Sequence, residues 1–165
     1  MAPGGRLITD PKFYTAYNAV FNAIKTALTY VPAEGETPAR GIEALKTVVV
    51  GEQFTLTGLP KAVINPIPGP VESASMDGLL TVHVRGSVTV VIREYAPKNW
   101  FDDVIKPMSA VVDALLADRT LGGKCDDCVV TLFAPGEIKF KDATGKDQLL
   151  YGGDIGFEAK LLYEP

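Results

Sequence analysis

Two long stretches of alternating apolar and polar residues constrain the fold of this chain more than any other feature. In the stretch Leu80–Arg93, every second residue is aliphatic except at Gly86, and most residues between them are polar. Residues 149–163 repeat the pattern with aromatic and aliphatic side chains. Successive side chains of a strand point to opposite faces, so each stretch predicts a long strand with one apolar face. The first exceeds the usual length of about five to six residues, which predicts a bend or bulge at Gly86.

Two other segments have the three-to-four residue spacing of amphipathic helices. The first follows Asp10, the expected N-cap, and Pro11, which suits the first helical position because its missing N–H is unneeded there. The second follows an expected cap at Asn99, and Pro107 is expected to kink or split it. The apolar stripe of the first helix consists of Phe13, Tyr17, Val20, Phe21, Ile24 and Leu28.

Shorter strands are predicted between and after these elements. Residues 46–50 form one, and residues 53–57 continue it or pair with it. Residues 62–64 are expected at a sheet edge, because Pro60, Pro66, Pro68 and Pro70 lack the N–H that a central strand needs. Residues 129–133 and 138–141 are predicted as two separate strands.

The order helix, strands, helix, strands predicts an α+β fold. We expect a two-layer sandwich in which a mostly antiparallel β-sheet carries two amphipathic α-helices on one face. A length of 165 residues suits a single domain, 1–165, whose first residues, 1–9, form a flexible N-terminus. Gly122 and Gly123 are the candidate structural turn that ends the second helical region with left-handed backbone.

The charge pattern disfavours general binding to nucleic acid or to anionic membranes. The chain has 16 basic and 20 acidic residues, a formal net charge of -4, and no run of like charge. Such partners require clustered Lys and Arg. No apolar run approaches the ~20 residues that a bilayer requires, and the first residues contain no apolar signal core. We therefore expect a protein that is made and used in the cytoplasm, without a membrane.

Few residues are available for side-chain chemistry. Cys125 and Cys128 are the two cysteines, in a C-x-x-C spacing, and His83 is the single histidine. A zinc site would need two further ligands. A strand-like segment follows the cysteines, and Asp126 and Asp127 raise thiol pKa values, which opposes redox activation. We expect reduced, structural thiols, no metal, no cofactor and no enzymatic activity, with His83 at a surface or interface.

The polar face of the predicted sheet suggests self-assembly. Arg85, Arg93, Asp154 and Glu158 are the candidate intersubunit contacts on this face, although solvated ion pairs within one chain are an equal alternative. Strands longer than the helices that cover them predict a projecting hairpin, whose edges are open to another chain. The loops at 33–40, 65–77 and 142–147 are the candidate contacts to other partners, with plain surface connections as the alternative.

An ordered set of short motifs resembles the tail terminator (tail completion) proteins of long-tailed bacteriophages or related viruses. The motifs are DALLADRTLGGKCDDC, from Asp113 to Cys128, and YGGDIGFEAKLLY, from Tyr151 to Tyr163. The first helix and the strand at Leu80–Arg93 agree with the same pattern, so the resemblance spans most of the chain. The proline-rich stretch at 60–70 and the two cysteines depart from it, which puts the loop contacts in doubt.

The resemblance implies a structural virion protein and no catalytic residue. It implies a ring, typically a homo-hexamer, that caps the tail tube protein, stops tube polymerisation and joins the tail to the neck or connector protein. It also implies a place at the tail–neck junction of the virion, after assembly in the host cytoplasm. DNA would pass through the lumen without specific binding, for which a negative net charge is suitable.

Three alternatives remain open at this point. One is a head–tail connector or adaptor protein of the neck. Another is a small enzyme that uses the cysteine pair or the Asp-rich loops as a metal site, which requires bound zinc or a depressed thiol pKa. The third is a cellular α+β ligand-binding module, which would be monomeric with a pocket beside its helices.

Overall fold

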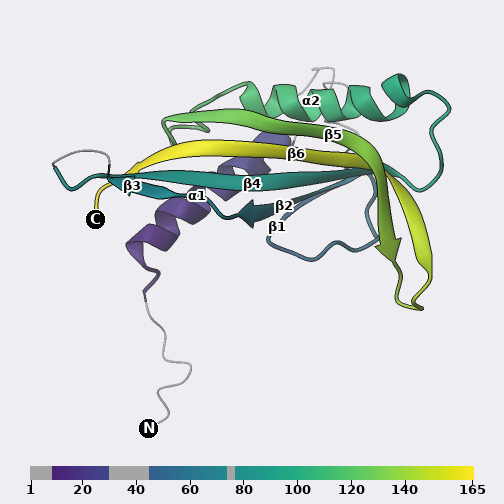
Figure 1. Cartoon of the computed structure of the whole chain (residues 1–165), viewed down its shortest axis with the longest axis horizontal. Coiled ribbons are helices and arrows are strands. Elements are labelled where there is room, and N and C mark those ends of the chain that lie inside the picture. The colour runs from purple at the N-terminus through teal and green to yellow at the C-terminus, as the bar shows by residue number, and fades with distance from the viewer. Residues whose placement is uncertain (1–8, 30–44, 74–76) are drawn as a thin grey trace, which may run out of the picture.

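The structure is a computed structural model that describes residues 9–29, 45–73 and 77–165 (Figure 1). Its described part is an α+β fold with a six-stranded sheet in the order β1-β2-β4-β6-β5, and β3 lies beside β4. The β1–β2 pair is parallel, and the other pairs are antiparallel. The elements are α1 (Lys12–Leu28), β1 (Thr47–Val50), β2 (Lys61–Ile67), β3 (Val71–Ser73), β4 (Leu80–Arg93), η1 (Phe101–Ile105), α2 (Lys106–Leu116), β5 (Asp127–Lys141) and β6 (Asp147–Tyr163).

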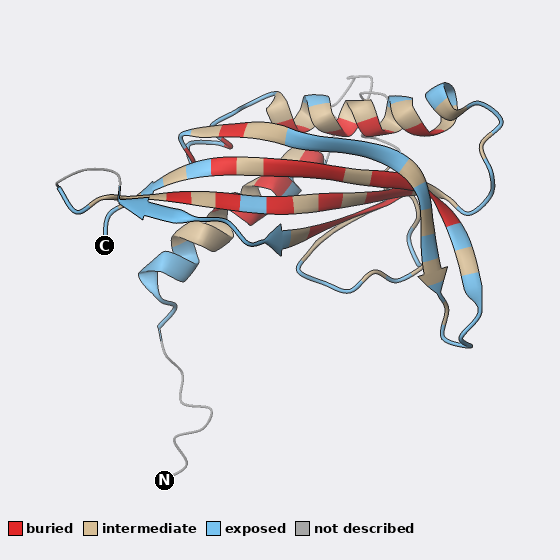
Figure 2. Ribbon diagram, viewed as in Figure 1, coloured by how far each residue is buried: buried red, intermediate tan, exposed pale blue. Residues whose placement is uncertain are grey.

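Both helices pack on one face of the sheet, as predicted. In Figure 1, α1 passes behind the strands, and α2 runs along the β5 side. The two helices contact each other and β6. Alternate residues of β4 and β6 point into the core between the layers, which gives the striped burial in Figure 2. The largest fully buried side chains of this core include Phe157, Ile24, Leu28, Ile64, Met108 and Leu115.

β4 is continuous through Gly86, so the bend predicted there is wrong. Gly86 pairs with Phe157 of β6 and with Pro66 of β2 without a shift of register. The register shift lies between Val91 and Arg93 instead. Gly86 serves packing: a Cβ atom there would lie 2.7 Å from Cε1 of Phe157, so the missing side chain leaves room for that ring.

β5 is one strand, which corrects the prediction of two strands separated by residues 134–137. It pairs with β6 along its whole length, with one register shift between Val130 and Leu132. Pro135 is tolerated inside it because β5 is the last strand of the sheet, where an N–H is not needed on the open side. The far end of the β5–β6 hairpin curls away from the helices and extends beyond the rest of the sheet (Figure 1).

The helical segments begin differently from prediction. Pro11, not Asp10, is the N-cap of α1, and no side chain caps this end. The segment after Asn99 begins with the π-helical turn η1 and continues as α2, with Pro107 in the first turn of α2. The segment is not split at this proline, because η1 continues directly into α2 with helical backbone at Ile105 and Lys106. The hydrogen-bond pattern changes there instead: the Asp103 N–H donates to Asn99 O as in an α-helix, and the Lys106 N–H donates to Phe101 O as in a π-helix.

A small second cluster covers the opposite face of the sheet near the curled hairpin. Residues 53–57, predicted as a strand, are irregular and lie over this face. The ring of Phe54 meets Phe140 of β5 edge to face at 5.2 Å between centroids. Lys61 is buried beside it and donates to Thr55 Oγ1 over 2.8 Å. Val63, Val91 and Leu150 are also buried outside the main core.

β2 lies inside the sheet, between β1 and β4, so its prediction as an edge strand is wrong for residues 62–64. β1 pairs with β2 only from Lys61 to Ile64. Beyond Ile64 the outer side of β2 has no described partner strand, and Pro66 lies there. The prolines therefore limit how far β1 can extend along β2, and they do not exclude β2 from the interior.

Candidate assembly surfaces

The face of the sheet opposite the helices holds a cross-strand cluster of polar side chains. Arg85 and Glu158 are direct partners in the register, and Arg85 Nε donates to Glu158 Oε1 over 2.7 Å. His83 Nδ1 lies 3.2 Å from the same oxygen. Thr89 Oγ1 donates to Asp154 Oδ1 over 2.7 Å. Three of the four candidate contact residues thus lie on this face with partners inside the chain, and their contact with a second subunit stays a prediction.

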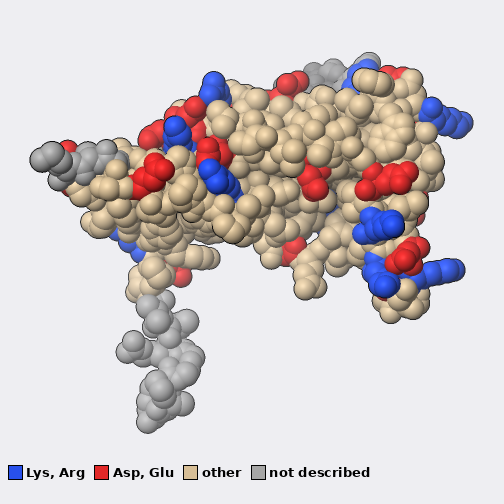
Figure 3. Space-filling model, viewed as in Figure 1, with Lys and Arg blue, Asp and Glu red and all other residues tan. Residues whose placement is uncertain are grey.

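The electrostatics of this cluster keep Glu158 ionised. The hydrogen bond from Arg85 is the main cause that holds the pKa of the Glu158 carboxyl below its ordinary value. Figure 3 shows charged side chains gathered toward the β3 end of this face and around the β5–β6 hairpin, with mostly uncharged surface between them. The middle of the face is therefore suited to contacts that do not depend on charge.

Arg93 does not share this face, contrary to prediction. The extra residue between Val91 and Arg93 inverts the alternation of β4, so Arg93 pairs with Tyr151 and turns toward the helices. Its Nη1 lies 2.9 Å from Asp103 Oδ2 of η1. Its guanidinium carbon lies 3.9 Å from the centroid of the Tyr95 ring. Arg93 therefore ties the end of β4 to the start of the second helical segment.

Asp103 and Asn99 cap that segment reciprocally. Asn99 Oδ1 accepts hydrogen bonds from the backbone N–H of Phe101 and Asp102, as predicted for this cap. In return, Asp103 Oδ2 accepts from the backbone N–H of Lys98 and Asn99. The Asn99 backbone bond is the main cause that lowers the pKa of the Asp103 carboxyl. Sequence reasoning identified Asn99 and missed that Asp103 joins the cap to Arg93.

The cysteines are free, buried thiols beside the start of β5. Burial is the main cause that raises the pKa of Cys125 to about 11 and the pKa of Cys128 to about 12. Asp126 and Asp127 raise the pKa of Cys125 further, which confirms the predicted direction. The thiolate is the reactive and metal-binding form, so this environment disfavours both uses. Across the described ranges, no group of three or more His, Cys, Asp or Glu could hold a metal ion.

Gly122 and Gly123 lie in the turn between α2 and β5. Their φ angles are 70° and 82°, in the left-handed region, and the preceding Leu121 has a φ of 50°. Asp118 Oδ2 accepts from the Gly122 N–H over 2.9 Å, and Thr120 Oγ1 accepts from the Gly123 N–H over 3.2 Å. Glycine adopts such left-handed φ angles without a steric penalty, so these two residues allow the turn to form.

One edge of the sheet is formed by β5, whose middle part is uncharged and exposed. β5 pairs only with β6 among the described strands, and residues 131–135 are all exposed (Figure 2). Leu132 is 52% exposed and Phe133 is 39% exposed. Leu132 is opposite Gly156 and Phe133 is opposite Ile155, so the two side chains point to opposite faces. We name residues 131–135 the β5 edge.

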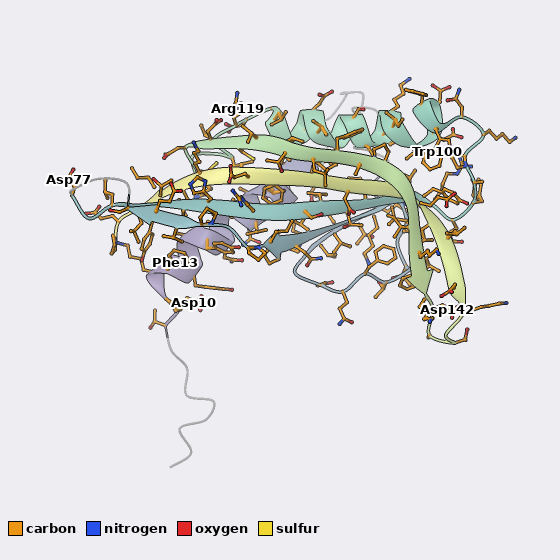
Figure 4. All side chains as sticks on the ribbon, viewed as in Figure 1. Asp10, Phe13, Asp77, Trp100, Arg119 and Asp142 are labelled. Carbon is orange, nitrogen blue, oxygen red and sulfur yellow. The ribbon has the colours of Figure 1, made fainter. Side chains whose placement is uncertain are left out.

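A different apolar surface lies toward the opposite edge of the sheet, near β2 and β3. Figure 4 labels Phe13 at the start of α1, on the side of the molecule away from Trp100. Phe13 and Tyr17 line a hollow of about 450 Å³ together with Pro66, Ile67 and Pro68. This proline surface, as we name these five residues, also has Val71 at its rim. Ile67 and Val71 are exposed large apolar side chains.

The three candidate loops have different outcomes. Residues 33–40 lie outside the described residues. Residues 65–77 were predicted as a loop, but they contain the end of β2 and all of β3, because the prolines leave enough N–H groups for pairing with β4. Residues 142–147 include the turn of the β5–β6 hairpin, as expected. Asp142 Oδ1 accepts from the Thr144 and Lys146 N–H groups there, both over 2.9 Å.

The sequence contains a feature of the β5 edge that the predictions did not use. Residues 128–136 form a run without a single charge, although charged residues are frequent on both sides of it. Edge strands of monomeric proteins usually carry charges that prevent association. The uncharged run is therefore a local signal that this strand lacks the charges that usually protect an edge.

The sequence matches no protein-family model and no curated protein. In the described ranges, no helix is long and apolar enough to cross a membrane. What supports a function is therefore the pair of apolar surfaces, together with the residues that carry the resemblance.

Proposed function

We propose that the protein is a structural virion protein that forms a ring, caps the tail tube, terminates tube polymerisation and joins the tail to the head–neck complex. The observation that carries this proposal is the presence of two unlike apolar surfaces, the β5 edge and the proline surface, on opposite sides of one sheet. The α+β fold and the motifs at 113–128 and 151–163 agree with the tail terminator resemblance.

Unlike surfaces favour a ring over a two-fold dimer. A two-fold dimer joins one surface to an identical copy of itself, whereas a contact between unlike surfaces repeats from copy to copy and closes as a ring or continues as a filament. The β5 edge offers backbone groups interrupted by one proline, Pro135. The proline surface offers apolar side chains and few N–H donors, because Pro66 and Pro68 have none. The two surfaces therefore differ in chemistry.

The first test is the mass of the purified protein at several concentrations, by light scattering coupled to size exclusion. We expect a species near six times the 17.6 kDa chain mass, alone or after tail tubes are added. The variant Leu132→Lys places a charge on the β5 edge and should shift the protein to monomers. Leu162→Lys is the matched control, because Leu162 is similarly exposed on β6 and lies away from that edge.

A monomer at all concentrations, with and without tubes, would contradict the ring. Cross-linking then separates the two neck roles: a terminator cross-links to the tube subunit, and a head–tail connector cross-links to the portal subunit. A tube-polymerisation assay adds the functional readout, because a terminator fixes tube length, and Leu132→Lys should release that control.

A second candidate function, a ligand-binding module, is favoured by one observation. A cavity of about 750 Å³ lies between α1 and the end of α2, and five alanines, among them Ala23 and Ala114, are part of its lining. Such a size suits a small apolar ligand. This alternative predicts a monomer whose melting temperature rises with an apolar ligand, and Ala23→Trp, which fills the cavity, should abolish that rise.

A further inference from the structure

A hollow opens between η1 and the part of β5 where the β5–β6 hairpin begins to curl. It has a volume of about 430 Å³ and is lined by Trp100, Ile105, Pro135, Gly136 and Glu137. Figure 4 labels Trp100 at the end of the molecule where β5 and β6 curl. The hollow therefore brings the single tryptophan of the chain and a carboxylate from a different element to one place.

A buried tyrosine of β6 explains why these two side chains meet. Glu137 is directly opposite Tyr151 in the β5–β6 register, and side chains opposite each other lie on the same face of a sheet. The Trp100 ring meets the Tyr151 ring edge to face, at 5.9 Å between centroids. Trp100 and Glu137 are therefore both neighbours of Tyr151, which holds the indole beside the end of β5.

Glu137 has no cationic partner in the part of the chain that the structure describes. It is exposed, and none of the ion pairs between described residues includes it. Arg93 pairs with the other side of Tyr151 in the register, but its Nη1 lies 2.9 Å from Asp103 Oδ2. Arg93 is therefore already bound to a carboxylate, and the charge of Glu137 is available to a cation that enters the hollow.

An indole beside a carboxylate is a combination that recognises a cation. Tryptophan attracts a cation to its ring more strongly than phenylalanine or tyrosine does. A carboxylate accepts two parallel hydrogen bonds from a guanidinium. A guanidinium is planar and more weakly hydrated than an ammonium, so it is better suited to the apolar walls that Ile105 and Pro135 provide. Arginine is therefore the side chain that fits this hollow best.

We propose that this hollow binds an arginine side chain of a partner protein, with the guanidinium between the Trp100 indole and the Glu137 carboxylate. Charge complementarity decides the occupant, because the lining contains one carboxylate and no cationic side chain. The hollow adjoins the β5 edge at Pro135, so a segment of the partner that approaches this edge brings its arginine to the hollow. This inference does not depend on the proposed ring, because a single copy of the chain forms the whole hollow.

The test is fluorine NMR of the full chain labelled with 5-fluorotryptophan, because the single tryptophan gives a single resonance. The probe is an N-acetylated glycine–arginine–glycine amide, with citrulline and leucine analogues as neutral comparisons, all at about 0.15 M salt. The arginine peptide should shift the resonance with a dissociation constant roughly tenfold lower than that of the citrulline peptide. This is the order expected for one exposed cation–π contact and one exposed ion pair. No shift with the arginine peptide would overturn the proposal, and so would equal binding of the citrulline or leucine peptide.

The variant Glu137→Gln separates recognition in the hollow from a general attraction of cations to an acidic protein. It keeps the size of the side chain and removes its charge, so the arginine peptide should bind roughly threefold more weakly. Glu94→Gln is the matched control, because it removes the same charge from an exposed position outside the lining and should leave binding unchanged. Unchanged binding in Glu137→Gln, or an equal loss in both variants, would contradict the assignment of the arginine to this hollow.

Discussion

Single residues decide local packing in this protein through size more than through charge. Gly86 lies in the middle of β4, where a glycine ordinarily weakens a sheet. Here it lies directly opposite Phe157, whose ring also meets Phe21 of α1 at 5.8 Å between centroids. The absence of a side chain on β4 therefore lets one aromatic ring bridge the sheet and the helix layer.

Gly86→Ala should consequently destabilise the protein. The added Cβ would lie 2.7 Å from Phe157 Cε1 and 2.9 Å from the Asn65 carbonyl oxygen. Overpacking of this kind lowers the free energy of unfolding by roughly 1–3 kcal/mol, measurable by urea denaturation. Gly136→Ala is the control on β5, because no atom lies within 4 Å of its Cβ position. Equal stability of the two variants would show that the Phe157 ring does not fill this space.

Among the secondary-structure elements, the two helices and one irregular segment cover the faces of the sheet. The helices bury one face, and the segment at residues 51–60 buries part of the other where the β5–β6 hairpin curls (Figure 1). Phe54 joins this segment to β5 through Phe140, and the Lys61 ammonium lies 5.7 Å from the centroid of the Phe54 ring. The segment thus acts as a third, partial layer.

Phe54→Ala should uncouple this layer from the hairpin. Loss of a half-buried aromatic ring should lower the free energy of unfolding by roughly 1–3 kcal/mol, less than for a fully buried phenylalanine. Phe101→Ala is the matched control, because Phe101 is 71% exposed and its loss should change stability by less than about 0.5 kcal/mol. If both variants unfold at the same urea concentration as the parent protein, the segment does not stabilise the hairpin.

At the scale of the whole molecule, both helices and the strands contribute to one continuous core. Ile24 of α1, Met108 of α2 and Cys128 of β5 are all fully buried in it. The thiols are therefore protected by the entire core, and their raised pKa values leave little thiolate at neutral pH. Their reactivity is a readout of global unfolding.

Ile24→Ala should increase the alkylation rate of Cys128 although the two residues lie in different elements. Truncating a fully buried isoleucine lowers stability by roughly 2–5 kcal/mol, which raises the unfolded population, and with it the rate, by more than about tenfold. Tyr14→Ala, an exposed position on the same helix, should leave the rate unchanged. Mass spectrometry of iodoacetamide-treated protein at pH 8 measures both. An unaltered rate in Ile24→Ala would show that Cys128 is exposed by local opening.

Local patterns in the chain were enough to predict the elements whose periodicity is regular. The apolar stripe of α1, the strands β4 and β6, the Asn99 cap and the hairpin turn at 142–147 each follow from local spacing and turn chemistry. The α+β class follows as well, because two one-sided long strands must be covered by the two amphipathic helices. The direction in which aspartates shift the Cys125 pKa was also predictable, since charge and proximity in sequence suffice for it.

Which residues meet across strands, and which strand has no second neighbour among the described residues, could not be predicted before the strands were placed in space. The bulge between Val91 and Arg93 moves Arg93 to the other face, and no local pattern marks it. The contact of His83 with Glu72 and Glu158 joins three strands and depends on register. Register and strand order are set by long-range packing: a shift by one residue reverses every side chain, and local spacing says nothing about the neighbour. The β5 edge and the proline surface are products of that order.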